Sequence, residues 1–387
     1  MGVWYKIMFS KNSVINTVIV LSILFVIVRF VIHSTVFMGW DFRNNLWAPA
    51  YLLVNHQSPY KIDVLFDVGN AVWMPMVIGS FFPLGFFSLQ QASNSWLIFS
   101  SLGLLSIVWL SSGFRRPPLP LFIIAATMSF LFPPSITHLL LGQISILVTL
   151  IFVAVIVWYE KMPTFLVSFL VAIALSKPQL AILVLPGFAL YKFKKDGGTR
   201  SVILFTVLLL TCILILTAPL FWAYSNWYED FAMELQQNPH WAHPSSLSAL
   251  QNLTPDFGSI IWGILATILF SLNIWLWSVL PRQSAILWSL ALTPLITPYV
   301  WTWDFVMMLP LFASSLFQVR VKAALGTLIL GYISCWMLIV KMKFGNNYND
   351  NSYWWVPWFF VAVIICGKVI DQLIRHRRIW AMPLTRL

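Results

Sequence analysis

Long apolar runs recur along the whole chain and limit what it can fold into. Each run has about 15 to 23 residues, enough to cross or nearly cross a hydrocarbon core of roughly 30 Å as a helix. The runs are continuously apolar and do not alternate with polar residues, which favours helices over a barrel. Only 9% of the 387 residues are charged, whereas about a quarter are charged in an ordinary soluble domain. The sequence therefore predicts an all-α, polytopic transmembrane protein.

We expect about 12 to 13 membrane segments, some of them broken or re-entrant, within one integral membrane domain spanning residues 1–387. The predicted segments are 13–36, 71–88, 96–113, 119–133, 144–159, 163–176, 178–191, 200–221, 257–280, 284–298, 304–319, 323–341 and 353–373.

Basic residues gather at short loops and at both ends of the chain, which sets the predicted orientation. The expected cytoplasmic clusters are Lys6/Lys11, Arg115/Arg116, Lys192/Lys194/Lys195/Arg200, Arg320/Lys322 and Arg375/Arg377/Arg378. Both termini are then cytoplasmic in a multi-pass cell-membrane protein, and the first apolar run is a retained anchor. An odd number of crossings must precede Arg115, so segment 71–88, interrupted by Pro75 and Pro83, is predicted to be broken or re-entrant.

This orientation places the polar segments on the outer side of the membrane. They are a first external loop at 38–70, the stretch 133–145, a second large loop at 222–256 and the turn 297–304. Most of the chain's 12 acidic residues lie in or beside them. We expect these segments to line one external cavity.

Lys177 interrupts a largely apolar stretch that runs from Lys161 to Lys192. A single helix over that stretch would be about 43 Å long and would leave the ammonium group in hydrocarbon. Two shorter helices that break at Pro178 solve both problems. Lys177 is then either a snorkelling residue at a helix end or a functional residue, since charges inside membrane segments are candidates for function.

Several classes of chemistry have no support in the sequence. It has no Gly-rich phosphate loop, no H-E-x-x-H, no G-x-S-x-G and no D-x-D pair, and no clear internal repeat of the kind typical of transporters. His240 and His243 are weak candidates for a metal site because Pro239 and Pro244 disfavour a helix there. We predict no metal and no cofactor.

A series of short motifs carries a resemblance to a known family. The motifs are GWDFRNNLWAPAYLL with Asp41, SPY at Ser58 to Tyr60, WMP at Trp73 to Pro75, GQIS at Gly142 to Ser145, ALSKPQL at Ala174 to Leu180, SLSALQNL at Ser246 to Leu253 and TPYVWTWDFVMML at Thr297 to Leu309. In order and spacing they resemble the polyprenyl-phosphate-sugar-dependent glycosyltransferases of the GT-C superfamily, most closely glycosyltransferase family 87. Trp73 and Tyr299 depart from the family pattern, which usually has Tyr and often His at these positions.

The resemblance implies inverting, metal-independent transfer from a lipid-phosphate sugar. An aspartate must take the proton of the acceptor hydroxyl, and Asp41 matches that position; its alternative role is a helix cap. Fixed positive charge must stabilise the leaving lipid phosphate. Lys177 is the first candidate for this role, with Arg43 and Lys61 as assistants.

Other residues are candidates for binding the sugar or the acceptor. They are Asp304, Gln143, Tyr60, Trp303 and Tyr299. Asp304 could instead cap the helix 304–319, and Gln143 could satisfy backbone groups at a turn.

The predicted function is transfer of a hexose, most plausibly mannose, from a polyprenyl-phosphate donor to a glycolipid or glycan acceptor at the extracytoplasmic face of the cell envelope. The predicted partners are this donor, the acceptor and membrane lipids, with no nucleic acid. Two alternatives stay open: a flippase or transporter of lipid-linked sugars, and a polymerase or ligase that moves a whole lipid-linked glycan.

Overall fold

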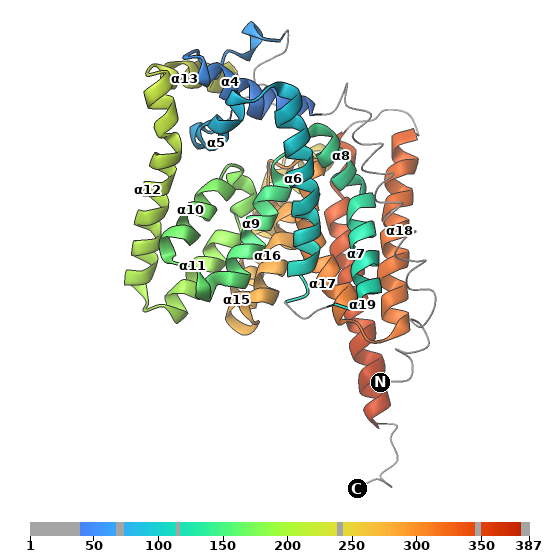
Figure 1. Ribbon diagram of the computed structural model, residues 1–387. Helices are drawn as coiled ribbons and strands as arrows, with labels where there is room; N and C mark the ends of the chain where they lie inside the picture. Colours follow the sequence, from blue (N-terminus) through green and yellow to red (C-terminus); the bar gives the residue numbers. More distant parts are fainter. Residues whose placement is uncertain (1–38, 67–72, 114–116, 238–242, 345–349, 381–387) are drawn as a thin grey trace.

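The computed structural model describes residues 39–66, 73–113, 117–237, 243–344 and 350–380 (Figure 1). Every regular element in these ranges is a helix, and no strand occurs among them. This confirms the prediction of an all-α protein. The predicted first membrane segment, 13–36, lies outside the described residues.

Five of the described helices are long and apolar enough to cross a membrane, or six if one bent pair counts as a single span. The five are α6 (Leu89–Leu110), α12 (Thr199–Ala223), α15 (Gly258–Val279), α18 (Lys322–Phe344) and α19 (Val356–Trp380). The bent pair joins α7 (Leu119–Leu131) to α8 (Pro133–Leu141) at an angle of 62°. The chain is therefore a multi-pass membrane protein, although most other predicted segments are too short to span alone.

Helix α9 (Ser145–Trp158) forms the centre of the molecule. Its sequence, SILVTLIFVAVIVW, carries no charge, and almost all of its side chains are buried. A helix that is apolar on all sides is buried on all sides, and α9 packs between α6, α10 (Thr164–Ala174) and α16 (Arg282–Ile296). Helix α9 has 14 residues and is about 21 Å long, so it is a short helix buried inside the bundle.

Two predicted breaks are present in the structure. The described part of segment 71–88, residues 73–88, contains the short helix α5 (Pro75–Phe81) and the 3₁₀ turn η3 (Phe82–Phe86) as its regular elements before Leu89. The stretch around Lys177 divides into α10, the 3₁₀ turn η5 (Pro178–Ala181) and α11 (Val184–Lys195). Proline has no backbone N–H to donate, so each break falls where a helical hydrogen bond is already missing.

The remaining elements are short. They are α3 (Trp40–Phe42), the π-helical turn η1 (Arg43–Trp47), α4 (Ala48–Val54), η2 (Ile62–Val64), η4 (Tyr159–Lys161), α13 (Trp227–Gln237), α14 (Ser246–Leu253), η6 (Thr302–Met308), α17 (Leu309–Gln318) and η7 (Asp350–Tyr353). In Figure 1, α4, α5 and α13 gather at one end of the bundle, and α11 and α15 reach the other. The first of these ends carries the candidate site.

Candidate active site

The position of Asp41 is set by a close contact between α3 and the turn after α8. The backbone N–H of Gly39 donates to the carbonyl of Leu140 at 2.6 Å. Helix α8 ends at Gly142, whose φ of +71° is a left-handed value that L side chains rarely adopt. A Cβ atom on Gly142 would lie 2.5 Å from the Cβ of Phe42, so only glycine allows this approach.

The Asp41 carboxylate is held by two side-chain amides. Gln143 Nε2 donates to Oδ2 at 2.5 Å, and Asn45 Nδ2 donates to Oδ1 at 3.3 Å. The N-cap of α3 is Gly39, so Asp41 is not the capping residue. Its carboxylate accepts from neutral donors. Asp41 lies two residues before Arg43, the first residue of the π-helical turn η1, and such turns are frequent at functional sites.

Each of these amides leaves its own oxygen without a partner. Gln143 Oε1 and Asn45 Oδ1 are buried and have no hydrogen-bond donor among the described residues. Buried acceptors are nearly always paired in native proteins, so two orphans beside one carboxylate call for an explanation. A ligand that brings hydroxyl groups, such as a sugar, would supply donors to both.

A buried ion pair forms the second part of the site. Lys177 Nζ lies 2.7 Å from Asp304 Oδ1, and both side chains are buried. Ser145 donates its hydroxyl to the same aspartate oxygen and accepts from Lys177 Nζ at 3.0 Å. Lys177 occupies the break before Pro178, and Ser145 is the first residue of α9. The first residue of the buried helix α9 therefore supplies the hydroxyl that hydrogen-bonds to both Lys177 and Asp304.

Asp304 also organises the turn that contains it. Its Oδ2 accepts from the backbone N–H of Trp301 at 3.0 Å, three residues earlier in the chain. Asp304 is not the N-cap of η6, which is Trp301, but one of its carboxylate oxygens accepts from the N-cap N–H and so stabilises the start of η6. The other oxygen holds Lys177, and sugar binding by Asp304 stays a prediction. The helix predicted at 304–319 consists of η6 followed by α17.

The two parts of the site interact electrostatically. Burial raises the pKa of the Asp41 carboxyl above its ordinary value, and the negative charge of Asp304 raises it further. The hydrogen bond from Gln143 and the positive charge of Lys177 lower that pKa, but burial prevails. Asp41 is thus a stronger proton acceptor than an exposed aspartate.

Aromatic side chains lie beside the ion pair. The indole rings of Trp301 and Trp303 stack with centroids 4.9 Å apart, and His243 contacts Tyr299 at 3.9 Å between centroids. Burial raises the pKa of the Tyr299 hydroxyl, a hydrogen bond with Trp301 lowers it, and the negative charges of Asp304 and Asp41 raise it further. Trp303 Nε1 is a buried donor with no acceptor among the described residues.

The predicted external segments therefore meet in the folded chain. Gln143, in the 133–145 stretch, contacts Asp41 in the first loop. Ser145, in the same stretch, contacts Asp304 in the 297–304 turn through its hydroxyl. The 222–256 loop reaches the same turn through His243 and the first loop through Asp230.

Comparison with known families identifies the chain at this point. Glycosyltransferase family 87 matches residues 75–298, more than half of the sequence. The chain belongs to glycosyltransferase family 87. Gln143, Ser145 and Lys177 fall within the matched region, whereas Asp41 and Asp304 flank it. No curated protein matches the chain.

Three residues predicted for the site of this family member have other partners in the structure. Arg43 Nε donates to Asn44 Oδ1 at 2.8 Å, and its guanidinium group lies over the rings of Trp40 and Phe66. Lys61, half-exposed, pairs with Asp230 at 3.1 Å.

Tyr60 is buried among apolar side chains, packs against Phe231, and lies near the backbone carbonyl of Trp73. The structure thus shows no contact between Tyr60 and Asp41 or Lys177 among its described interactions.

Sequence reasoning overlooked several residues that the structure adds to the site. Asn45 could have been found, because it follows Asp41 by four residues and so lies on the same helix face. Ser145 lies in a recognised motif, but no local signal indicates that it contacts Asp304. Asp350, which accepts from the Thr302 hydroxyl at 2.7 Å, has no sequence signal. His138 accepts from the backbone N–H of Ile146 at 2.9 Å and so stabilises the first turn of α9.

Metal independence stays a prediction. Among the described residues, no group of three or more His, Cys, Asp or Glu side chains lies close enough to hold a metal ion. His240 lies outside the described residues, and His243 packs against aromatic rings.

Proposed function

We propose that this family 87 glycosyltransferase transfers a hexose, most plausibly mannose, from a polyprenyl-phosphate carrier to a glycolipid or glycan acceptor on the extracytoplasmic side. The observation that carries the proposal is the pairing of two unlike sites: a carboxylate held by two amides at Asp41, and a fixed ammonium group at Lys177. These are the base and the cation that inverting transfer from a lipid phosphate requires.

Asp41 is the proposed general base. An acceptor hydroxyl is a poor nucleophile and must lose its proton as it attacks the anomeric carbon. Burial raises the pKa of Asp41, which increases its affinity for that proton. The hydrogen bonds from Gln143 and Asn45 fix the carboxylate, so little reorganisation is needed when the acceptor arrives.

Lys177 is the proposed partner of the leaving phosphate. An ammonium group has three N–H donors, and Asp304 and Ser145 occupy two of them. The third is available for a phosphate oxygen, which gains negative charge as the bond to the sugar breaks. Asp304 is then a positioning residue that holds the Lys177 ammonium group in place. Arg43 and Lys61 have other partners, so the proposal relies on Lys177.

The sugar is proposed to lie between these two groups. The unpaired oxygens of Gln143 and Asn45 would accept from its hydroxyls, and the indole N–H of Trp303 would donate to one of them. Tyr299, partly exposed at the edge of the site, is placed to contact the acceptor.

The test is transfer by the purified full-length protein from synthetic polyprenyl-phosphate-mannose, with and without a membrane glycolipid extract. Asp41→Asn keeps a side chain of the same shape but removes the base, and we expect transfer to fall by about 10²- to 10⁴-fold. Asp63→Asn is the matched control, because Asp63 is an exposed acid of the same loop. Donor binding is measured in parallel and should persist in both variants.

Three results would contradict the proposal in different ways. Full transfer by Asp41→Asn would remove Asp41 as the base. Donor that is bound or moved across vesicles but never cleaved would favour the flippase. Transfer of a whole preassembled glycan, with no transfer of a single hexose, would favour the polymerase or ligase.

A further inference from the structure

A cavity lies at the opposite end of the bundle from Asp41. Helix α6 links the two places, because the Trp96 indole donates to the Gly142 carbonyl near the candidate site, while Leu110, at the other end of α6, lines this cavity. Leu110 follows Trp96 by 14 positions in α6, which corresponds to about 21 Å along the helix. Arg320 and Arg375, from the predicted cytoplasmic basic clusters, line the same cavity.

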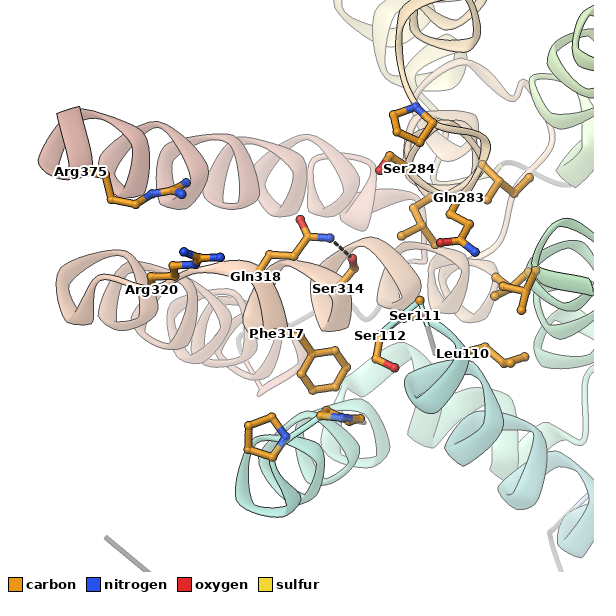
Figure 2. Close-up of a pocket in the computed structure, with 18 residues that line it drawn as sticks. Leu110, Ser111, Ser112, Gln283, Ser284, Ser314, Phe317, Gln318, Arg320 and Arg375 are labelled. Atoms are coloured by element: carbon orange, nitrogen blue, oxygen red, sulfur yellow. Dashed lines mark hydrogen bonds between the residues drawn. The ribbon is translucent and has the colours of Figure 1, made fainter. Parts of the chain in front are cut away.

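The cavity has an apolar part and a polar part. Its volume is about 580 Å³, within the usual size range of ligand pockets. Val153, Val157 and Ile286 contribute apolar surface from α9 and α16. Polar groups come from five places in the chain, shown in Figure 2: Ser112, Gln283, Ser284, Ser314, Gln318, Arg320 and Arg375.

The polar part carries an excess of positive charge. Arg375 pairs with Asp371 at 2.7 Å. The other oxygen of Asp371 accepts from the backbone N–H groups of Arg320 and Val321, so this buried acid is fully engaged. The Arg320 guanidinium is exposed and has no acidic partner among the described residues. Lys368 does not line the cavity, but it donates to Oε1 of Gln318, which does, at 3.4 Å.

We propose that this cavity binds the phosphate headgroup of an anionic membrane lipid. Guanidinium groups match the geometry of phosphate oxygens, and the helix ends place Arg320 where the cytoplasmic headgroups of a bilayer would lie. The apolar residues from α9 and α16 provide a surface for the first part of an acyl chain. A soluble anion would use the polar part alone. The site is distant from Asp41, so the inference does not depend on the proposed transfer reaction.

The test uses the purified full-length protein in nonionic detergent with a fluorescent phosphatidylglycerol. Unlabelled phosphatidylglycerol should displace the probe, whereas phosphatidylcholine, which has no net charge, and inorganic phosphate should do so only weakly. Arg320→Gln should weaken binding by about fivefold, the effect of one basic residue at a membrane surface. Ser112→Trp keeps the charge but fills the cavity, and should also abolish displaceable binding.

Lys194→Gln is the matched control, because it removes an exposed charge from the same predicted cytoplasmic side without altering the cavity. Its affinity should equal that of the wild type. An equal loss in Lys194→Gln and Arg320→Gln would overturn the proposal in favour of general surface attraction. Displacement by inorganic phosphate as strong as that by phosphatidylglycerol would overturn the lipid assignment. Unchanged binding in both Arg320→Gln and Ser112→Trp would overturn the site itself.

Discussion

The Lys177 to Asp304 ion pair allows a quantitative test of how the site is built. The side chains are 6% and 0% exposed, and their charged atoms are 2.7 Å apart. Asp304→Asn leaves an ammonium group buried without its counter-charge, and Lys177→Met leaves a carboxylate in the same situation. Each variant should lower the free energy of unfolding by about 3–5 kcal/mol, the cost of breaking a buried pair from one side.

The double variant is expected to be much less destabilised than the sum of the single variants. With both charges gone, no uncompensated ion remains, and the amide introduced by Asp304→Asn can still accept from the Trp301 N–H. We expect a coupling energy of about 2–3 kcal/mol between the two positions, near the upper end for residues in contact.

Unfolding in sodium dodecyl sulfate, followed by tryptophan fluorescence, measures these quantities without any assay of transfer. Ser315→Ala, at another buried hydroxyl on α17, serves as a control for generic loss of a buried polar group. An exposed surface ion pair contributes at most about 1 kcal/mol to stability. If the free energy of unfolding of each single variant lies within about 1 kcal/mol of the wild-type value, the reasoning is refuted. Strict additivity in the double variant would refute it as well, because independent charges cannot form a coupled pair.

Two further predictions concern the backbone contact and the titration of the base. Gly142→Ala should destabilise the protein by about 2–4 kcal/mol and reduce transfer, because it combines a left-handed φ with a clash against Phe42. Gly197→Ala is the control, since Gly197 has a φ of +101° and nothing within 4 Å of an added Cβ. This control should show backbone strain alone and keep full transfer. Burial raises the pKa of Asp41, so the acidic limb of the pH–rate profile should lie above the ordinary aspartate range and disappear in the residual rate of Asp41→Asn. The raised pKa also means that ionisation of Asp41 opposes folding. Asp41→Asn should therefore equal the wild type in stability below the ordinary pKa and exceed it increasingly as the pH rises through the raised pKa.

The fold class was predictable because its cause is local. In a membrane, continuous apolar runs can satisfy their backbone hydrogen-bonding groups only as helices. Pro178 interrupts a helix through its own missing N–H, so this break does not depend on the position of other segments. The role of α9 was not predictable in this way. An apolar run buried in protein and one buried in lipid have the same composition, so the sequence predicts a membrane segment at 144–159. In the structure this run is α9, a short helix buried inside the bundle.

The site was predictable in its residue types but not in its pairings. Asp41, Lys177 and Asp304 are conspicuous because charges are rare in this chain. Their partners are determined by contacts over long sequence separations: Gln143 follows Asp41 by 102 positions, and Asp304 follows Lys177 by 127. No periodicity carries information over such separations. The prediction of Lys61 as a phosphate ligand used its position in the loop and had no means of anticipating Asp230.

The sequence separation of the buried ion pair also bears on how the protein is made. A ribosome that adds about 5–20 residues per second needs roughly 6–25 s to proceed from Lys177 to Asp304. Throughout that interval the lysine has been synthesised and the carboxylate that neutralises it has not. The nascent chain must keep this ammonium hydrated or at an interface until η6 and α17 emerge. Completion of the site is thus a late event in synthesis, and any chain truncated before Asp304 retains a lysine without its counter-charge.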